Sequence, residues 1–343
     1  MNLVSIIMSV YDANKHLLKA IDSVLNQTMP DFELLVIYDQ SSYDSMDICR
    51  LYQDSRIRII QQNRVGMSGA KNTGIMHAKG SYIAFLNATD YWAPEKLEIQ
   101  LQHLHKNPKI GVSYCPSIFV DDNDKILGIK QSPKLTNIKI EDIFCRNPIS
   151  NGSTPIIRKS VLKDIRYFKH NQEYYFDETL KHSEDFDCWL RIATQSNWGF
   201  EGVKLALTYY RVNDNSLTVN VVNQFNSWKR VRNNLQKIAP DYVAQWGKLA
   251  EAYQLRYLCR CAIRSRDNAI ALKLALMAIT TNCRIIYKEP IRTLNTLICA
   301  GLINLLPRVI YCYLETSVMQ SIALINNLMT SISYSNNHNK YEA

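Results

Sequence analysis

Residues 1–110 alternate short runs of β-branched and other apolar residues with segments whose apolar residues recur at helical spacing. This alternation is typical of βαβ units that build a mainly parallel sheet. It predicts strands at Val4–Val10, Phe32–Asp39, Ile57–Gln61 and Tyr82–Leu86. We therefore expect an α/β domain of Rossmann-like type at the start of the chain.

Helices are expected between and after these strands. Leu17, Ile21 and Val24 fall on one helical face between the first two predicted strands. Three further helices are expected, over Met46–Tyr52, from near Ser68, and after Pro94. A hairpin is suggested by the short apolar runs on either side of Asp121–Asp124.

Beyond Thr218 the apolar pattern is helical only, with a helical pair expected at Lys248–Cys261 and Asn268–Thr281. We therefore divide the chain into an α/β domain, residues 1–220, and an α-helical extension, residues 221–343. The uncharged stretch Thr293–Pro307 is shorter than the ~20 apolar residues that span a membrane. It predicts an interfacial or bundle-packed helix.

Charge distinguishes the two parts. Residues 220–343 contain 15 Lys and Arg against 6 Asp and Glu, which accounts for the whole net charge of +9. Such a tail favours an anionic surface, either lipid headgroups or nucleic acid. Arg256, Arg260 and Arg264 share one helical face, but such a stripe is commonly a solvated face, and the tail resembles no nucleic-acid module. The hypothesis is peripheral membrane contact through basic helices, with no nucleic-acid partner.

The nine cysteines are scattered, and none forms a CxxC pair. They indicate reduced thiols of a cytoplasmic protein, without a disulfide framework or a zinc site. The apolar run at the N-terminus has no basic region before it, so a secretory signal is not expected. We expect a cytoplasmic protein, with contact at the cytoplasmic face of the membrane as a hypothesis.

Candidate ligand contacts follow the first two predicted strands. In an open parallel sheet, ligands bind at the carboxyl ends of the strands, where Tyr11, Asp12 and Asp39 are expected. An acidic side chain there can accept a hydrogen bond from a base N–H or a ribose hydroxyl. For Asp39 alone, the alternative is a cap for the next helix.

The segment GMSGAKNTGIMHAKGSYIAFLNATDYW, residues 66–92, offers glycines and a serine near a helix start, followed by Lys71. Such a helix start and one cation suit a phosphate-bearing ligand. The following strand brings Asn87, Thr89 and Asp90 to its carboxyl end. Mn²⁺ or Mg²⁺ takes carboxylate and phosphate oxygens and neutralises a diphosphate, so Asp90 is the predicted metal ligand.

These segments, in this order, resemble the family 2 glycosyltransferases, which are inverting enzymes of the glycosyltransferase A fold. The usual family pattern is VSIIIPVYN, then VDDGSTD, then ARNxGIxxAxGxYIxFLDSDDxW. The chain follows this pattern from Val4 to Trp92.

Two later segments extend the resemblance. HSEDFDCWLRIA, residues 182–193, resembles the EDxxLWLR motif, which implies that Asp185 is the general base and that Glu184 positions or assists it. The alternative for this acidic pair alone is a solvated helix start. YYRVNDNSLT, residues 209–218, resembles the closing YRxHxxSxS element, and Arg211 suits a phosphate contact or, alternatively, a structural salt bridge.

The sequence departs from the family pattern within the site itself. Asn87 and Thr89 stand where acids are usual, which leaves Asp90 as the single carboxylate of FLNATDYW. Lys71 stands for the usual Arg, and the VDDGS element has lost one acid and its glycine. Fewer carboxylates predict weaker metal affinity, although the diphosphate supplies its own oxygens and Thr89 can hydrogen-bond a ribose.

The resemblance implies transfer of a sugar from a nucleotide sugar, UDP-linked in the usual case, to a hydroxyl of a glycan or lipid-linked acceptor. Such a reaction belongs to cell-surface polysaccharide synthesis. The alternative is a degenerate relative that is weakly active or inactive and serves as a binding or scaffold partner. A Rossmann dehydrogenase or a sugar nucleotidyltransferase is disfavoured, because no glycine-rich loop follows the first strand.

Overall fold

The computed structural model describes residues 3–10, 14–38, 43–62, 66–149, 151–169, 171–212 and 221–306. A seven-stranded sheet lies at the centre of this part of the chain, in the order β12-β6-β9-β4-β1-β2-β3. Its strands are β1 (Val4–Val10), β2 (Phe32–Tyr38), β3 (Ile57–Gln61), β4 (Tyr82–Asn87), β6 (Ile110–Tyr114), β9 (Ile156–Arg158) and β12 (Gly199–Gly202). Only β9 runs antiparallel to its neighbours in this sheet, so the sheet is mainly parallel.

The predicted strands are confirmed, because β1 and β3 have the expected bounds and β4 ends one residue later than expected. Successive residues of β1 face opposite sides of the sheet. Met8 packs in a core with Leu17, whereas Ile7 packs in a second core with Phe85. Both faces of β1 are therefore buried, as a continuous apolar run requires.

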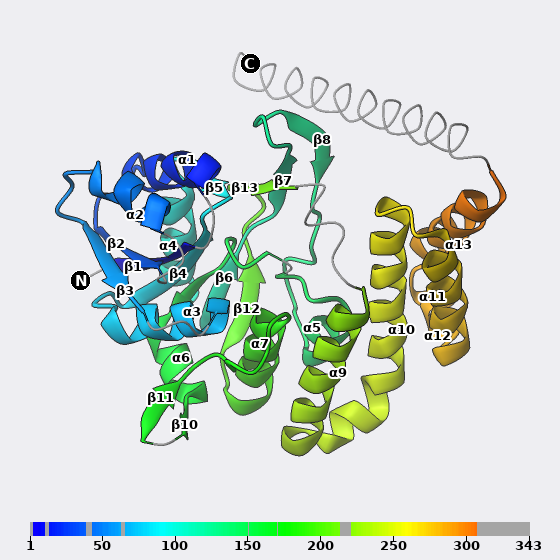
Figure 1. Cartoon of the computed structure of the whole chain (residues 1–343). Helices are drawn as coiled ribbons and strands as arrows, with labels where there is room; N and C mark the ends of the chain where they lie inside the picture. Colours follow the sequence, from blue (N-terminus) through cyan, green and yellow to red (C-terminus); the bar gives the residue numbers. More distant parts are fainter. Residues whose placement is uncertain are drawn as a thin grey trace, which may run out of the picture.

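Helices cover both faces of the sheet (Figure 1). One core contains residues of α1 (Asn14–Leu25), α2 (Tyr43–Arg50) and α4 (Lys96–Lys106). The other contains residues of α3 (Gly66–His77), α5 (Ile140–Arg146), α6 (Lys159–Ile165) and α7 (Glu184–Gln195). At Gly74 a Cβ atom would lie 2.4 Å from Cγ2 of Ile7, so this glycine lets α3 lie close to β1.

A smaller sheet has the order β5-β13-β7-β8. It consists of β5 (Tyr91–Trp92), β7 (Ser117–Val120), β8 (Ile126–Lys130) and β13 (Thr208–Arg211), while β10 (Tyr167–Lys169) and β11 (Gln172–Tyr174) form a separate ribbon. The antiparallel pairing of β7 with β8 confirms the predicted hairpin around Asp121–Asp124. Because β13 pairs with β5, Arg211 is carried to the region that follows β4.

The C-terminal part is helical over its described residues, 221–306, as predicted. It contains α9 (Val221–Ile238), α10 (Pro240–Arg264), α11 (Asn268–Thr281), α12 (Arg284–Lys288) and α13 (Pro290–Leu305). Figure 1 shows α9 and α10 beside α5, with α11, α12 and α13 farther out. The predicted helical pair is confirmed by α10 and α11, which pack against each other.

The two parts share apolar contacts. Trp228 and Leu235 of α9 belong to the core that also contains Phe144 of α5, whereas a separate core forms among α10, α11 and α13. The division at residue 220 stays a prediction, and residues 213–220 lie outside the described part. No helix among the described residues is both long and apolar enough to cross a membrane.

The basic stripe on α10 is not a uniform solvated face. Arg256 is buried and donates hydrogen bonds to Oγ1 of Thr293, at 2.7 Å, and to the carboxylate of Glu289. Arg260 and Arg264 are exposed. The expectation of a solvated stripe is therefore wrong for Arg256, because its ion pair with Glu289 connects α10 to the start of α13.

Candidate functional site

The site lies at the carboxyl ends of β1, β2 and β4. Tyr11, Asp12 and Asp39, the predicted donor contacts, lie outside the described residues, so their roles stay predictions. The strands before them end side by side, since Val10 pairs with Tyr38 and Ser9 pairs with Asn87. The turn after β4 therefore starts at the sheet edge where ligands of parallel sheets bind.

Asp90 is the most deeply buried polar side chain of this turn, at 1% exposure. Its Oδ2 accepts hydrogen bonds from Oγ of Ser153, at 2.6 Å, and from Nδ2 of Asn87, at 3.2 Å. Its Oδ1 accepts one from the backbone N–H of Arg211, at 3.1 Å. Burial raises the pKa of Asp90 to about 6, although the bonds from Ser153, Arg211 and Asn87 oppose that rise.

The guanidinium of Arg211 is committed to the protein. Its Nε donates to the carbonyl of Thr89 at 3.0 Å, and its Nη1 donates to the carbonyl of Asp121 at 2.5 Å. Its Nη2 forms an ion pair with Asp124 in the β7–β8 hairpin. Since the side chain is fully buried, the structure favours the salt bridge over the phosphate contact that the sequence left open.

Lys71 of α3 is paired with the two acids at the start of α7. Its Nζ lies 2.9 Å from Oε1 of Glu184 and 2.5 Å from Oδ1 of Asp185. Lys71 is only 3% exposed, and the ring of Phe176 lies beneath its ammonium. The expected phosphate contact by Lys71 is therefore not supported, because its ammonium is enclosed by the two carboxylates.

The electrostatics of this cluster are set by burial and by pairing. Burial opposes the charged form of Lys71, but Asp185 and Glu184 together outweigh burial and raise its pKa. Burial also raises the pKa of Asp185, assisted by the charge of Glu184 and opposed by Lys71. For Glu184, the ammonium of Lys71 outweighs burial and lowers the pKa. The pKa values of the two acids thus shift in opposite directions, with that of Asp185 rising and that of Glu184 falling.

Asp185 is held in place but not enclosed. Its side chain retains 23% exposure, and its Oδ2 lies where a Cβ atom on Gly152 would approach to 2.6 Å. Ser183, directly before α7, adopts a left-handed conformation with φ 64°. A partly accessible carboxylate in fixed geometry is what proton transfer to a general base requires.

The loop at residues 151–154 lies against both Asp90 and Asp185. Ser153 donates to Asp90, accepts from the backbone N–H of Asn87 at 3.0 Å, and accepts from Nε1 of Trp92 at its carbonyl. Its neighbour Gly152 lies against Asp185. Sequence reasoning missed this loop, since a short run of small polar residues carries no periodic signal.

The described residues do not fit a cation held by protein carboxylates. In the described ranges, no group of three or more His, Cys, Asp and Glu side chains could hold a metal ion. Asp90, the predicted ligand, is buried among three hydrogen-bond donors, while the half-buried Asn87 and Thr89 are neutral. The role of Asp90 as a metal ligand stays a prediction, and the side chains around Asp90 do not support that role.

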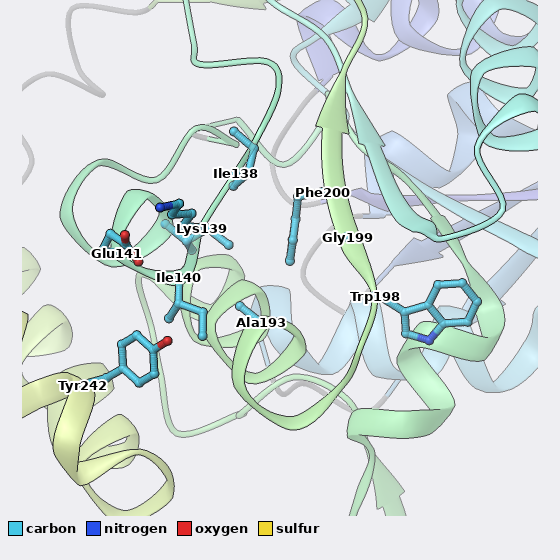
Figure 2. Close-up of a pocket in the computed structure, with 10 residues that line it drawn as sticks. Ile138, Lys139, Ile140, Glu141, Ala193, Trp198, Gly199, Phe200 and Tyr242 are labelled. Atoms are coloured by element: carbon cyan, nitrogen blue, oxygen red, sulfur yellow. The ribbon is translucent and has the colours of Figure 1, made fainter.

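A separate cavity of about 380 Å³ lies between α5, the end of α7, β12 and α10 (Figure 2). Phe200 of β12 and Tyr242 of α10 contribute to its lining. None of the predicted site residues lines this cavity. It is therefore distinct from the site at the ends of β1 and β4.

Comparisons with known proteins agree with this architecture. The family model described as "Glycosyl transferase family 2" matches residues 5–166. UDP-Glc:alpha-D-GlcNAc-diphosphoundecaprenol beta-1,3-glucosyltransferase WfaP of Escherichia coli is 32% identical over 225 residues, which cover 64% of this chain and 81% of that protein.

Two solved structures share the fold. TarS 1–349 of S. aureus in complex with UDP-GlcNAc has a TM-score of 0.55 and 19% identity, covering 98% of this chain and 92% of that chain. The mannosyltransferase PcManGT from Pyrobaculum calidifontis, in complex with GDP-Man and Mn²⁺, has a TM-score of 0.52 and 16% identity, covering 89% of this chain and 87% of that chain.

The sheet order, the helical layers and these matches define a glycosyltransferase A fold followed by a helical extension. The chain belongs to glycosyltransferase family 2. It is a transferase enzyme, and the family resemblance expected from the motifs is confirmed.

Proposed function

We propose that this enzyme moves a sugar, with inversion, from a UDP-sugar to a hydroxyl of a glycan or lipid-linked acceptor in cell-surface polysaccharide synthesis. The observation that carries the proposal is the placement of Asp185, which is partly exposed, paired with Lys71, and beside Gly152. The E. coli relative is named for a UDP-glucose donor and a diphosphoundecaprenol-linked acceptor, and the S. aureus neighbour was solved with UDP-GlcNAc.

In this mechanism, Asp185 accepts the proton of the acceptor hydroxyl as its oxygen attacks the anomeric carbon. The bond from that carbon to the diphosphate breaks, and UDP leaves with the electron pair. An α-linked donor then gives a β-linked product. Lys71 and Glu184 position Asp185, and the raised pKa of Asp185 makes it a stronger base than an exposed aspartate.

Donor binding in this proposal falls to the ends of β1, β2 and β4. Asp39 contacts the base, Tyr11 and Asp12 line the nucleotide, and the half-buried Asn87 and Thr89 offer hydrogen bonds to the ribose. A divalent cation was expected, and the P. calidifontis neighbour was solved with Mn²⁺. The described residues at this edge do not fit a cation, because the Asp90 carboxylate already accepts three hydrogen bonds within the protein.

The experiment that tests the proposal is sugar transfer across a panel of UDP- and GDP-sugars, with glycan and lipid-linked acceptors. The expected result is turnover with at least one UDP-sugar, and a product whose anomeric configuration, read by NMR, is opposite to that of the donor. Retention of configuration would contradict the base role of Asp185. UDP binding without transfer to any acceptor would instead favour the second candidate function, in which this chain is a weakly active or inactive member of the family. The neutral side chains of Asn87 and Thr89 are the observation in favour of that alternative.

We also propose that the helical extension contacts an anionic membrane peripherally. Ile291, Leu294, Ile298 and Leu305 are exposed and fall on one face of α13. Two exposed basic residues lie near the start of this helix in the sequence, Lys288 at the end of α12 and Arg292 in the first turn of α13. An apolar stripe flanked by cations suits the boundary between headgroups and acyl chains.

Co-sedimentation with phosphatidylcholine vesicles, with and without phosphatidylglycerol, tests this contact. Wild-type protein should bind the anionic vesicles and be released by high salt. The Leu294→Glu/Ile298→Glu variant should lose binding, while Leu205→Glu, at an exposed leucine before β13, should retain it. Equal binding by both variants, or a salt-resistant dimer in place of vesicle binding, would contradict the proposal.

A further inference from the structure

The end of β4 and the turn after it carry one buried acid, Asp90, and two half-buried neutral residues, Asn87 and Thr89. Asp90 lies at 1% exposure, and its two carboxylate oxygens accept three hydrogen bonds. The donors come from β13, from the 151–154 loop and from Asn87 at the end of β4. Asp90 therefore connects the central sheet to the smaller sheet.

A cation at this edge would require oxygen ligands that are free to turn toward it. Asp90 could turn only by giving up its bonds to Ser153 and to the backbone of Arg211, which hold two other segments in place. Mn²⁺ and Mg²⁺ take anionic oxygens at short range and demand regular geometry. The one carboxylate of this turn is therefore already used for structure.

The half-buried side chains of the turn do not replace it. Asn87 and Thr89 present an amide and a hydroxyl, and neither carries charge. Asn87 also donates its Nδ2 to Asp90, which fixes the orientation of the amide. The two acids at the start of α7, Glu184 and Asp185, are paired with Lys71.

We infer that the β4 edge supplies no carboxylate to a divalent cation, so that the nucleotide diphosphate binds with nearly the same affinity with and without Mn²⁺. The nucleotide part rests on the proposed function. Compared with the family pattern, carboxylates are missing at positions 87 and 89. Aspartates introduced at these two positions should therefore create a metal site that the wild-type chain lacks.

Isothermal titration with UDP, in Mn²⁺ and in EDTA, tests this inference. In the wild type, the two dissociation constants should agree within about twofold. In the Asn87→Asp/Thr89→Asp variant, Mn²⁺ should tighten UDP binding by about tenfold or more, the scale on which changes around a metal alter its affinity. The Asn87→Gln/Thr89→Ser variant is the matched neutral control and should respond as the wild type does.

A tenfold or greater effect of Mn²⁺ on wild-type UDP binding would overturn the inference. The same titration of Asp12→Asn and Asp39→Asn would then reveal whether either of these acids supplies the ligand. Asp90→Asn, verified as folded by its thermal transition, should leave the ratio of the two constants unchanged, and a change specific to this variant would restore Asp90 as a ligand.

Mn²⁺ alone, followed by electron paramagnetic resonance, separates this inference from the proposed function. Retention of Mn²⁺ by the double-aspartate variant but not by the wild type supports the inference. Retention by the wild type, or failure of the variant to retain Mn²⁺, overturns it. If UDP binds in neither buffer, the proposed donor is wrong, while the Mn²⁺ comparison still decides the inference.

Discussion

Two aspartates of this enzyme, Asp185 and Asp90, occupy opposite environments although the family motifs contain both. Asp185 is 23% exposed and pairs with one cation, Lys71, while its Oδ2 faces Gly152. Asp90 is 1% exposed, and three hydrogen-bond donors surround its carboxylate. The chemistry available to a carboxylate thus depends on its accessibility and its free lone pairs, and membership of a motif does not determine either.

The largest effect is expected from substitution of Asp185, the more exposed of the two aspartates. Asp185→Asn removes the proposed base, so kcat for sugar transfer should fall by about 10²- to 10⁴-fold. UDP-sugar affinity should stay near the wild-type value, because the side chain acts on the acceptor. Glu98→Gln, at an exposed acid on α4, is the control and should transfer normally. Full turnover by Asp185→Asn would place the base elsewhere.

Loss of the shared cation should affect stability more than any other substitution in the cluster. Lys71→Met leaves Glu184 and Asp185 as two largely buried like charges, so the free energy of unfolding should fall by about 3–5 kcal/mol. Urea denaturation measures the change. Lys71→Arg keeps the charge and should retain most of the stability. An unchanged urea denaturation curve for Lys71→Met would contradict the tight coupling of Lys71 with Glu184 and Asp185.

For Asp90, the buried aspartate, the expected effect is a dependence of the free energy of unfolding on pH. Burial raises the pKa of Asp90 from an ordinary 3.8 to about 6, so the folded state binds its proton more tightly than the unfolded state. The contribution of Asp90 to the free energy of unfolding is therefore greatest below pH 4. It falls by about 3 kcal/mol as pH rises through 6.

Denaturation of wild type and Asp90→Asn across pH 3.5–7 isolates this contribution. The wild type should lose stability relative to the variant as pH rises, whereas other titrating groups affect both proteins alike. A constant difference between the two curves would show that Asp90 keeps an ordinary pKa, and that its hydrogen bonds balance its burial.

The smallest effect is expected from crowding Asp185. Gly152→Ala places a Cβ atom 2.6 Å from Oδ2 of Asp185, so the carboxylate must shift, and kcat should fall by about 10- to 10²-fold. Donor affinity should be unchanged. Gly301→Ala on α13, where a Cβ atom meets nothing within 4 Å, is the matched control. Normal kcat for Gly152→Ala would mean that Asp185 tolerates displacement.

Much of the fold could be predicted from local patterns. The apolar runs of β1, β3 and β4 and the helical spacing of Leu17, Ile21 and Val24 are set by neighbours within a few residues. The β7–β8 hairpin and the α10–α11 pair depend on short connections as well. These features follow from burial of one face or both faces of an element, which the sequence records directly.

The partners of charged side chains could not be predicted in this way. Asp90 bonds to groups 63 and 121 residues away, and Lys71 pairs with an acid 114 residues away. Such pairs depend on how the sheets and helices assemble, and the sequence carries no spacing that reports it. For that reason the sequence could not show that Lys71 pairs with Glu184 and Asp185, or that Arg211 pairs with Asp124. The phosphate contacts expected of Lys71 and Arg211 stay predictions.

The packing of α9 has a practical consequence for truncation. Trp228 and Leu235 lie in the same apolar core as Phe144 of α5, and Trp228 stacks parallel to that ring. A fragment cut at residue 220 would leave this part of α5 facing water, which invites aggregation during expression. Val243 and Ala250 of α10 belong to the same core, so the shortest fragment suited to crystallisation or kinetic work should extend through Arg264, the last residue of α10.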